Sequence, residues 1–152
     1  PRGCGVGVEW KGTQFEEIPT GKGRKIKDGE ALAIISIGHI GNAAADAIKS
    51  VEADSSATIA HYDLRFAKPL DNELLHEVGK RFKQVITIEN GALRGGVGEA
   101  IVAFFNENGY DTKVTKLGID DKFIEHGTLE ELHEICGFDT KGIAKTINDI
   151  LR

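Results

Sequence analysis

Short β-branched runs alternate along this chain with stretches whose apolar residues recur at every third or fourth position. The clearest unit spans residues 85–105. Its first four residues form the run V-I-T-I, which is the composition of a strand buried on both faces. From Val97 onward the apolar spacing becomes that of one helix face, after a glycine-rich turn. This pattern predicts a strand, a turn and a helix, with Glu89 and Asn90 placed where the strand ends.

The same two periodicities predict the remaining elements. Strands are expected at residues 22–27, 32–37, 57–64 and 112–117. Helices are expected at residues 42–52, 71–82, 129–136 and 139–151. Three of these helices carry recognisable N-terminal caps, which are Asp71, the capping box of Thr128 and Glu131, and Asp139. Gly137 is expected to end the helix that precedes it.

Strands that alternate with helices imply crossover connections, which place parallel strands in one sheet with helices on both faces. We therefore expect an α/β fold, a three-layer α/β/α sandwich of about five mostly parallel strands. The first strand is expected to be an antiparallel edge strand that pairs through a tight turn at residues 27–30. Residues 1–23 are interpreted as an interdomain linker with an irregular lead-in, and residues 24–152 as one domain. The chain begins with Pro1 and contains no methionine, so we expect it to be part of a longer polypeptide.

The composition is that of an ordinary water-soluble globule, with 40% hydrophobic and 28% charged residues. A net charge of −5 disfavours nucleic-acid binding, which needs clustered lysine and arginine. No run reaches the roughly 18 apolar residues of a membrane span, and no secretory leader is apparent. Cys4 and Cys136 lie far apart in the sequence, so we expect two reduced thiols and a cytoplasmic protein.

The glycine-rich turn at residues 91–98 invites comparison with phosphate-binding loops. It satisfies neither the P-loop nor the dinucleotide-binding pattern. Backbone amides at the start of the following helix are still able to hold an anion. The interpretation that we favour is that Gly95, Gly96 and Gly98 let the helix approach the strand or a partner surface.

Several polar residues are candidates for a site at the sheet edge. Glu89 and Asn90 are placed to orient a substrate or a cofactor loop, or equally to contact another domain. His39 follows a predicted strand, and His126 lies in a predicted loop, where a loop-fixing hydrogen bond is the favoured role.

Arg2 stands between proline and glycine, an arrangement suited to capturing a carboxylate or phosphate, although a disordered terminus is the favoured interpretation.

The five histidines show none of the spacings that a structural zinc site requires, so no metal site is expected. His76 and His133 fall on predicted helices and are expected to be solvated. His61 alternates with Asp63 on one face of a predicted strand.

A series of motifs along the chain resembles the C-terminal domain of the 1-deoxy-D-xylulose-5-phosphate synthase family. In order they are P-R-G at residues 1–3, G-K-G at 21–23, D-L-R-F-A-K-P-L-D at 63–71, I-E-N with G-G-V-G within 88–98, and G-I-D-D-K-F-I-E-H-G at 118–127. The resemblance covers essentially the whole chain. The runs at 63–71 and 123–127 are specific, whereas the glutamate–glycine unit is shared with transketolases and with the β subunits of 2-oxoacid dehydrogenases.

The resemblance implies part of a thiamine-diphosphate enzyme that decarboxylates pyruvate and joins the two-carbon unit to glyceraldehyde 3-phosphate. The product, 1-deoxy-D-xylulose 5-phosphate, feeds isoprenoid and thiamine synthesis. In such synthases the N-terminal and central domains hold thiamine diphosphate and Mg²⁺. We therefore expect no catalytic residue and no cofactor site in this chain, and an isolated chain that is inactive.

The resemblance also assigns roles to particular residues. Arg2 matches the family's arginine at the substrate-phosphate end of the active site, so it is expected to bind the phosphate of glyceraldehyde 3-phosphate. The sheet edge with Glu89, Asn90, Gly95 and Gly96 is expected to face the other domains of the same chain or the second subunit of a homodimer.

Two alternatives stay open. One is the equivalent C-terminal domain of a transketolase or of a 2-oxoacid dehydrogenase β subunit. The other is a stand-alone α/β module that binds an anionic metabolite at the helix that follows Gly95 and Gly96.

Overall fold

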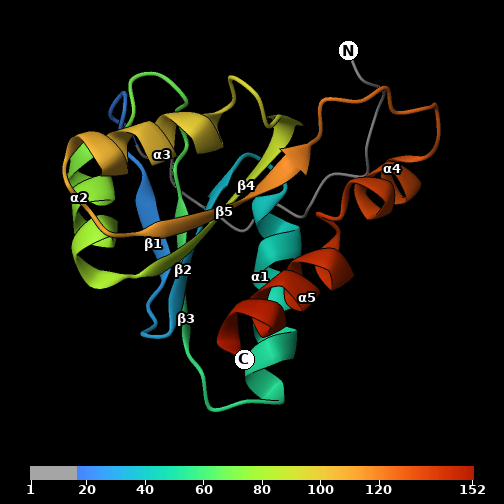
Figure 1. The fold of residues 1–152 in the computed structure, drawn as a ribbon, viewed down its shortest axis with the longest axis horizontal. Helices are drawn as coiled ribbons and strands as arrows, with labels where there is room; N and C mark the ends of the chain where they lie inside the picture. Colours follow the sequence, from blue (N-terminus) through green and yellow to red (C-terminus); the bar gives the residue numbers. More distant parts are fainter. Residues whose placement is uncertain (1–16) are drawn as a thin grey trace.

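The computed structural model describes residues 17–152 and shows one mixed sheet covered by helices on both faces (Figure 1). The strands are β1 (Arg24–Lys27), β2 (Leu32–Ile37), β3 (Ile59–Asp63), β4 (Gln84–Ala92) and β5 (Lys113–Ile119). The helices are α1 (Gly41–Ala53), α2 (Asn72–Arg81), α3 (Val97–Glu107), α4 (Leu129–Cys136) and α5 (Thr140–Leu151). Arg2 and most of the predicted linker lie outside the described residues.

The strand order across the sheet is β1-β3-β2-β4-β5. β1 runs antiparallel to β3, and every other neighbouring pair is parallel. The predicted α/β sandwich with an antiparallel edge strand is therefore confirmed.

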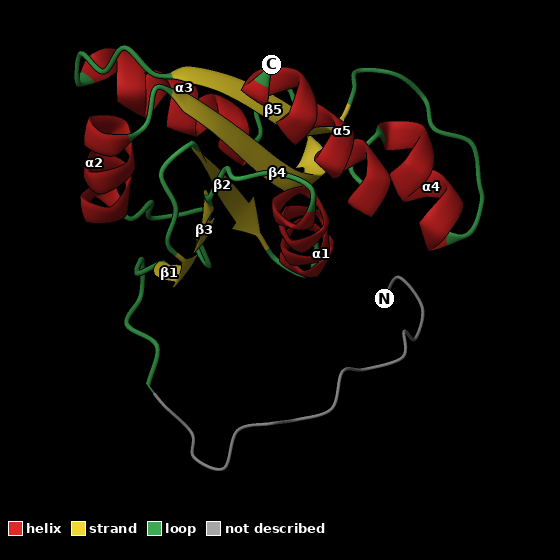
Figure 2. Cartoon of the chain, turned by 90° about the horizontal axis from the view of Figure 1, so that it is seen from below, coloured by secondary structure: helices red, strands yellow, loops and turns green. Residues whose placement is uncertain are grey.

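Two hydrophobic cores hold the layers together, one on each face of the sheet. On one face, α1 and α5 pack against the central strands, and Ile48 and Ile147 are buried there. On the other face, α2 and α3 do the same through Leu75 and Phe105. Figure 2 shows α2 and α3 on one side of the sheet, α1 and α5 on the other, and α4 beside α5 at the end of the molecule. β2, at the centre, is buried on both faces, as its apolar run predicts.

The predicted helix caps are all present. The Asp71 carboxylate accepts a hydrogen bond from the Leu74 amide (3.1 Å), and the Asp139 carboxylate accepts one from the Gly142 amide (2.9 Å). Thr128 and Glu131 form the reciprocal capping box of α4. Gly137 ends α4 in the left-handed conformation, with φ of 73°. Local sequence signals therefore define the ends of these helices.

The turn at residues 27–30 does not form the tight hairpin that the sequence predicts. β1 pairs with β3, so the chain must cross the start of β3 before it enters β2. During this crossing the backbone amides of Glu30 and Ala31 donate to the carbonyl oxygen of Thr58, at 3.0 and 2.9 Å. A Cβ atom on Gly29 would lie 2.3 Å from the backbone of Ile59. Close contact with β3 therefore replaces the predicted hairpin.

β4 is longer than its apolar run predicts. It continues to Ala92, so that Glu89 and Asn90 lie within the strand and not beyond its end. The extension is stabilised by β5, because Ala92 pairs with Ile119 after an irregularity in the register. The prediction that the strand stops before Glu89 is therefore wrong.

Candidate functional site

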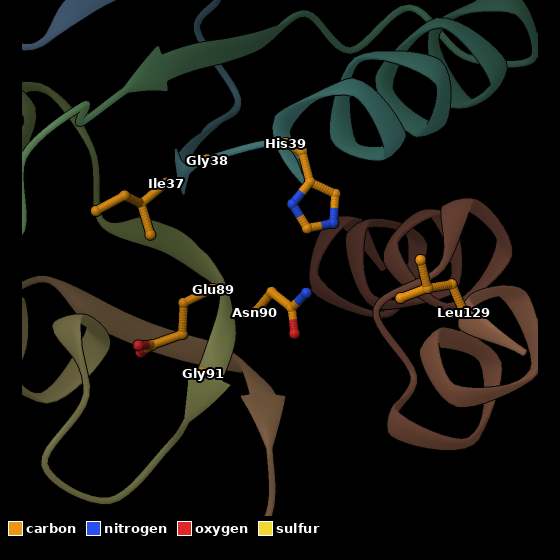
Figure 3. Close-up of a pocket in the computed structure, with 7 residues that line it drawn as sticks. All are labelled: Ile37, Gly38, His39, Glu89, Asn90, Gly91 and Leu129. Atoms are coloured by element: carbon orange, nitrogen blue, oxygen red, sulfur yellow. The ribbon is translucent and has the colours of Figure 1, made fainter. Parts of the chain in front are cut away.

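The chain reverses its winding direction between β2 and β4. After β2 the chain enters α1 on one face of the sheet, whereas after β4 it enters α3 on the opposite face. Ligand sites of open α/β sheets form where two such connections diverge, at the carboxyl ends of the strands. A cavity of about 490 Å³ opens at this point. Its lining residues are Ile37, Gly38, His39, Glu89, Asn90, Gly91 and Leu129 (Figure 3).

Three of the residues predicted from the sequence therefore meet in one place. His39 comes from the loop after β2, and Glu89 and Asn90 come from β4. Figure 3 shows the side chains of His39 and Asn90 pointing toward each other, while the carboxylate of Glu89 points to the opposite side. We refer to this hollow as the switch-point cavity.

The carboxylate of Glu89 binds the N-terminus of α3. The side chain is 6% exposed, and its two oxygens accept hydrogen bonds from the backbone amides of Val97 (2.9 Å) and Gly98 (2.8 Å). Unpaired amides and the helix dipole make the N-terminus of a helix favourable for an anion. Here the protein supplies that anion itself, so the amides that a phosphate would need are already used.

The glycines of the turn allow this close approach. A Cβ atom on Gly96 would lie 2.2 Å from the carbonyl oxygen of Ala92 and 2.6 Å from the carboxylate of Glu89. One on Gly98 would lie 2.7 Å from Oγ1 of Thr87. Gly95 makes no such contact, but its φ of +69° is a conformation that favours glycine. These distances favour the packing interpretation of the turn over the anion-binding one.

α4 borders the switch-point cavity through Leu129, and its His133 stacks on His39. The ring of His133 on α4 lies 5.8 Å from the ring of His39, and 5.0 Å from Phe138. Nε2 of His133 is buried and has no hydrogen-bond partner within residues 17–152. Burial lowers the pKa of His133, and the nearby His39 lowers it further. The prediction that His133 is solvated is therefore wrong.

A second cavity, of about 350 Å³, continues beneath α4. It shares Asn90 and Leu129 with the first, and apolar side chains such as Ile119, Ile124 and Leu132 form much of its wall. His126 is exposed in the loop before α4 and lines neither cavity. The structure thus separates His126 from His39, Glu89 and Asn90.

His76 is half-buried, whereas the sequence predicts a solvated side chain. Its Nδ1 lies 2.8 Å from the hydroxyl oxygen of Tyr110, and its ring packs edge-on against Phe104. The helical position of His76 gave no indication of this contact, because Tyr110 is 34 residues away in the sequence.

A buried serine–histidine pair lies in the centre of the sheet. Nε2 of His61 on β3 is 2.9 Å from Oγ of Ser36 on β2, and both residues are 1% exposed. A Cβ atom on Gly41, at the start of α1, would lie 2.8 Å from the same Oγ. The pair is sealed beneath α1, so we assign it a structural role. Burial lowers the pKa of His61 to about 4. The negative charge of Asp63 acts to raise this pKa, and the positive charge of Arg24 acts to lower it.

The lowered pKa of His61 predicts a loss of stability in mild acid. Since the unfolded chain takes up this proton near pH 6.5, the contribution is complete above that pH and declines as the pH falls toward 4. Between pH 8 and pH 5 we expect the free energy of unfolding to fall by about 2 kcal/mol through this group. Urea denaturation at the two pH values measures the loss. In a His61→Gln variant the loss should be smaller by that amount, and an equal loss in both proteins would contradict the assignment.

The described part of the chain lacks both a metal-binding cluster and a membrane-spanning helix. Residues 17–152 contain no group of three or more histidine, cysteine, aspartate or glutamate side chains arranged to hold a metal ion. None of the helices within the same residues combines the length and the apolar character needed to cross a membrane.

Comparison with known proteins gives a consistent result. The family model for the transketolase C-terminal domain matches residues 21–143. The chain is similar to 1-deoxy-D-xylulose-5-phosphate synthases from Bacteroides fragilis (54% identity over 147 residues) and Bacteroides thetaiotaomicron (53% over 147 residues). Each match covers 97% of this chain, but the chain spans only 22% and 23% of the length of these two relatives.

Solved structures agree with this relationship. A structure described as a split-gene transketolase, inactive β4 tetramer, superposes with a TM-score of 0.81 and 29% identity over 90% of this chain and 44% of that one. The transketolase of Campylobacter jejuni superposes with a TM-score of 0.61 over 89% of this chain and 19% of its own. At 15% identity, the second likeness concerns the fold alone.

Proposed function

Because the chain belongs to the family of transketolase C-terminal domains, we propose that it is the C-terminal domain of a 1-deoxy-D-xylulose-5-phosphate synthase. The longer polypeptide would convert pyruvate and glyceraldehyde 3-phosphate to 1-deoxy-D-xylulose 5-phosphate and CO2. The observation that carries this proposal is the 54% identity that extends over 97% of the chain. The F-I-E-H-G run at residues 123–127 adds motif-level support.

The proposed reaction requires thiamine diphosphate and Mg²⁺, and we assign their binding to the other domains of the longer polypeptide. When bound, thiamine diphosphate supplies an electron sink for the two-carbon carbanion that is left by decarboxylation. The start of α3 does not fit the diphosphate of this cofactor. The amides at the start of α3, which offer a place for a diphosphate, are bonded to Glu89 instead.

In this proposal the chain acts as a docking and scaffold domain. The switch-point cavity, with His39 and Asn90 on its wall, would face the other domains or the second subunit of a homodimer. Arg2 would reach the active site and bind the phosphate of glyceraldehyde 3-phosphate through charge-assisted hydrogen bonds. We place the enzyme in the cytoplasm and its product in isoprenoid and thiamine synthesis.

The test compares the 152-residue chain with the longer polypeptide that contains it. With pyruvate, glyceraldehyde 3-phosphate, thiamine diphosphate and Mg²⁺, we expect the longer protein to release CO2 and form 1-deoxy-D-xylulose 5-phosphate. We expect the isolated chain to give no turnover, and calorimetry to detect no micromolar binding of thiamine diphosphate or glyceraldehyde 3-phosphate.

Other outcomes would select an alternative. Two-carbon transfer from a ketose phosphate without release of CO2 would indicate a transketolase. Saturable micromolar binding of glyceraldehyde 3-phosphate by the isolated chain would indicate a stand-alone anion-binding module.

A further inference from the structure

The negative charge of the chain is concentrated in one segment. Residues 120–136 contain six acidic residues and a single lysine, so this segment carries a net charge of −5, which equals that of the whole chain. The acidic residues are Asp120, Asp121, Glu125, Glu130, Glu131 and Glu134. We call residues 120–136, which comprise a loop and α4, the acidic segment.

The acidic segment also exposes large apolar side chains. Phe123 is completely exposed, and Leu129 and Ile135 are 51% and 61% exposed. Within residues 17–152, these three are the majority of the exposed large hydrophobic residues, since only Ile18 and Ile26 join them. No residue of α4 is buried, although the helix has a polar and an apolar face. Phe123, Leu129 and Ile135 are therefore uncovered by the described part of the chain.

The helical part of the segment is preformed, because α4 is defined at both ends. The capping box of Thr128 and Glu131 begins α4, and Gly137 ends it. Figure 2 shows α4 at the end of the molecule, with the loop before it extending away from the sheet. A helix held in this position presents its side chains without a large ordering cost on binding.

Most of the acidic side chains are not neutralised within the domain. Asp121 pairs with Arg94 at 3.6 Å, and Glu131 is used by the capping box. Within residues 17–152, Glu125, Glu130 and Glu134 form no ion pair. Apolar side chains set among unpaired carboxylates are complementary to a surface with an apolar centre and a rim of lysine and arginine.

We propose that the acidic segment is the docking surface for a basic, apolar-centred protein surface on the remaining domains of the longer polypeptide. The inference rests on the proposed function only in requiring that such domains exist. A second copy of this chain is the less suitable occupant, because the same face would bring a charge of −5 against −5. Covalent linkage to the partner raises its effective concentration, so a modest interface is sufficient.

Amide hydrogen exchange, measured by mass spectrometry without cofactor or substrate, tests this proposal. In the longer polypeptide, we expect peptides from residues 123–136 to exchange at least tenfold more slowly than in the 152-residue chain. Peptides from residues 24–31, at the opposite edge, should exchange equally in both. Raising the salt concentration should reduce the protection of the acidic segment, since screening weakens charge pairing.

Matched variants separate docking from folding. The double variant Phe123→Ser with Glu134→Lys, made in the longer polypeptide, should lose the protection. The control Ile26→Ser with Glu107→Lys removes one exposed apolar group and reverses one exposed charge elsewhere, and should retain it. In the 152-residue chain the first double variant should exchange like the unmodified chain, which shows that α4 still forms.

Two results would overturn the proposal. One is equal exchange of the acidic segment in the long and short chains. The other is protection of the short chain that grows with its concentration, since this would make a second copy the occupant. The proposed reaction and the docking surface can fail separately. If the segment is protected but the protein does not turn over pyruvate, the proposed reaction is wrong. If the enzyme is active but the segment is unprotected, the docking surface is wrong.

Discussion

Replacement of Glu89 by alanine is expected to lower the free energy of unfolding by about 3 kcal/mol, because one buried and one partly buried amide lose a charged acceptor. The carboxylate bonds the amides of Val97 and Gly98 at 2.9 and 2.8 Å and is 6% exposed, so water cannot easily take its place. The alanine variant also removes a negative charge from the positive end of the α3 dipole. Urea denaturation of the isolated chain at pH 7 measures the loss.

Glu99 provides the matched control for this variant. It lies in the first turn of the same helix and accepts a hydrogen bond from the Gly95 amide at 2.8 Å, but its side chain is exposed. The Gly95 amide, together with Lys116, keeps the pKa of Glu99 below its ordinary value. Glu99→Ala should be far less destabilising than Glu89→Ala. If the two variants lose equal stability, Glu89 is not the anion that holds the start of α3.

Gly96→Ala should be as damaging, with a loss of about 3 kcal/mol from overpacking. The added Cβ would lie 2.2 Å from a backbone oxygen of β4 and 2.6 Å from the Glu89 carboxylate, so α3 must move away from the strand. The movement would also break the hydrogen bonds that Glu89 makes, so the two losses should not be additive. A double variant, Glu89→Ala with Gly96→Ala, measures this coupling.

The neighbouring glycine separates steric crowding from backbone strain. Gly95 has open space around its Cβ position, and only its positive φ opposes a side chain. Gly95→Ala is therefore expected to cost about 1 kcal/mol, the usual penalty of a left-handed residue. A larger loss at Gly95 than at Gly96 would contradict the proposed close packing of α3 on β4.

Much of the fold could be predicted from the sequence because its determinants are local. β2 occupies the residues that its apolar run predicts, and Asp71, Thr128 and Asp139 cap helices as their positions predict. Pairing across the sheet is not a local property. The partner of β1 and the length of β4 depend on contacts with β3 and β5, which no short-range pattern encodes.

Part of the candidate site could also be predicted from the sequence. Residues near the carboxyl ends of parallel strands gather at one edge of a sheet, and this rule brings His39 together with Glu89 and Asn90. The partners of individual side chains could not be predicted. His133 meets His39 because the tertiary fold brings α4 close to the loop after β2, and Ser36 meets His61 because their strands are neighbours.

The carboxylate that holds the start of α3 also affects which ligands this fold can accept. The sheet has the strand order and the diverging loops of a metabolite-binding fold. However, the Glu89 side chain occupies the helix N-terminus at which phosphates usually bind. A single side chain can therefore decide whether the start of this helix is free to bind an outside anion. In relatives that carry a short neutral residue at this position, the vacated helix end would again be open to an outside anion.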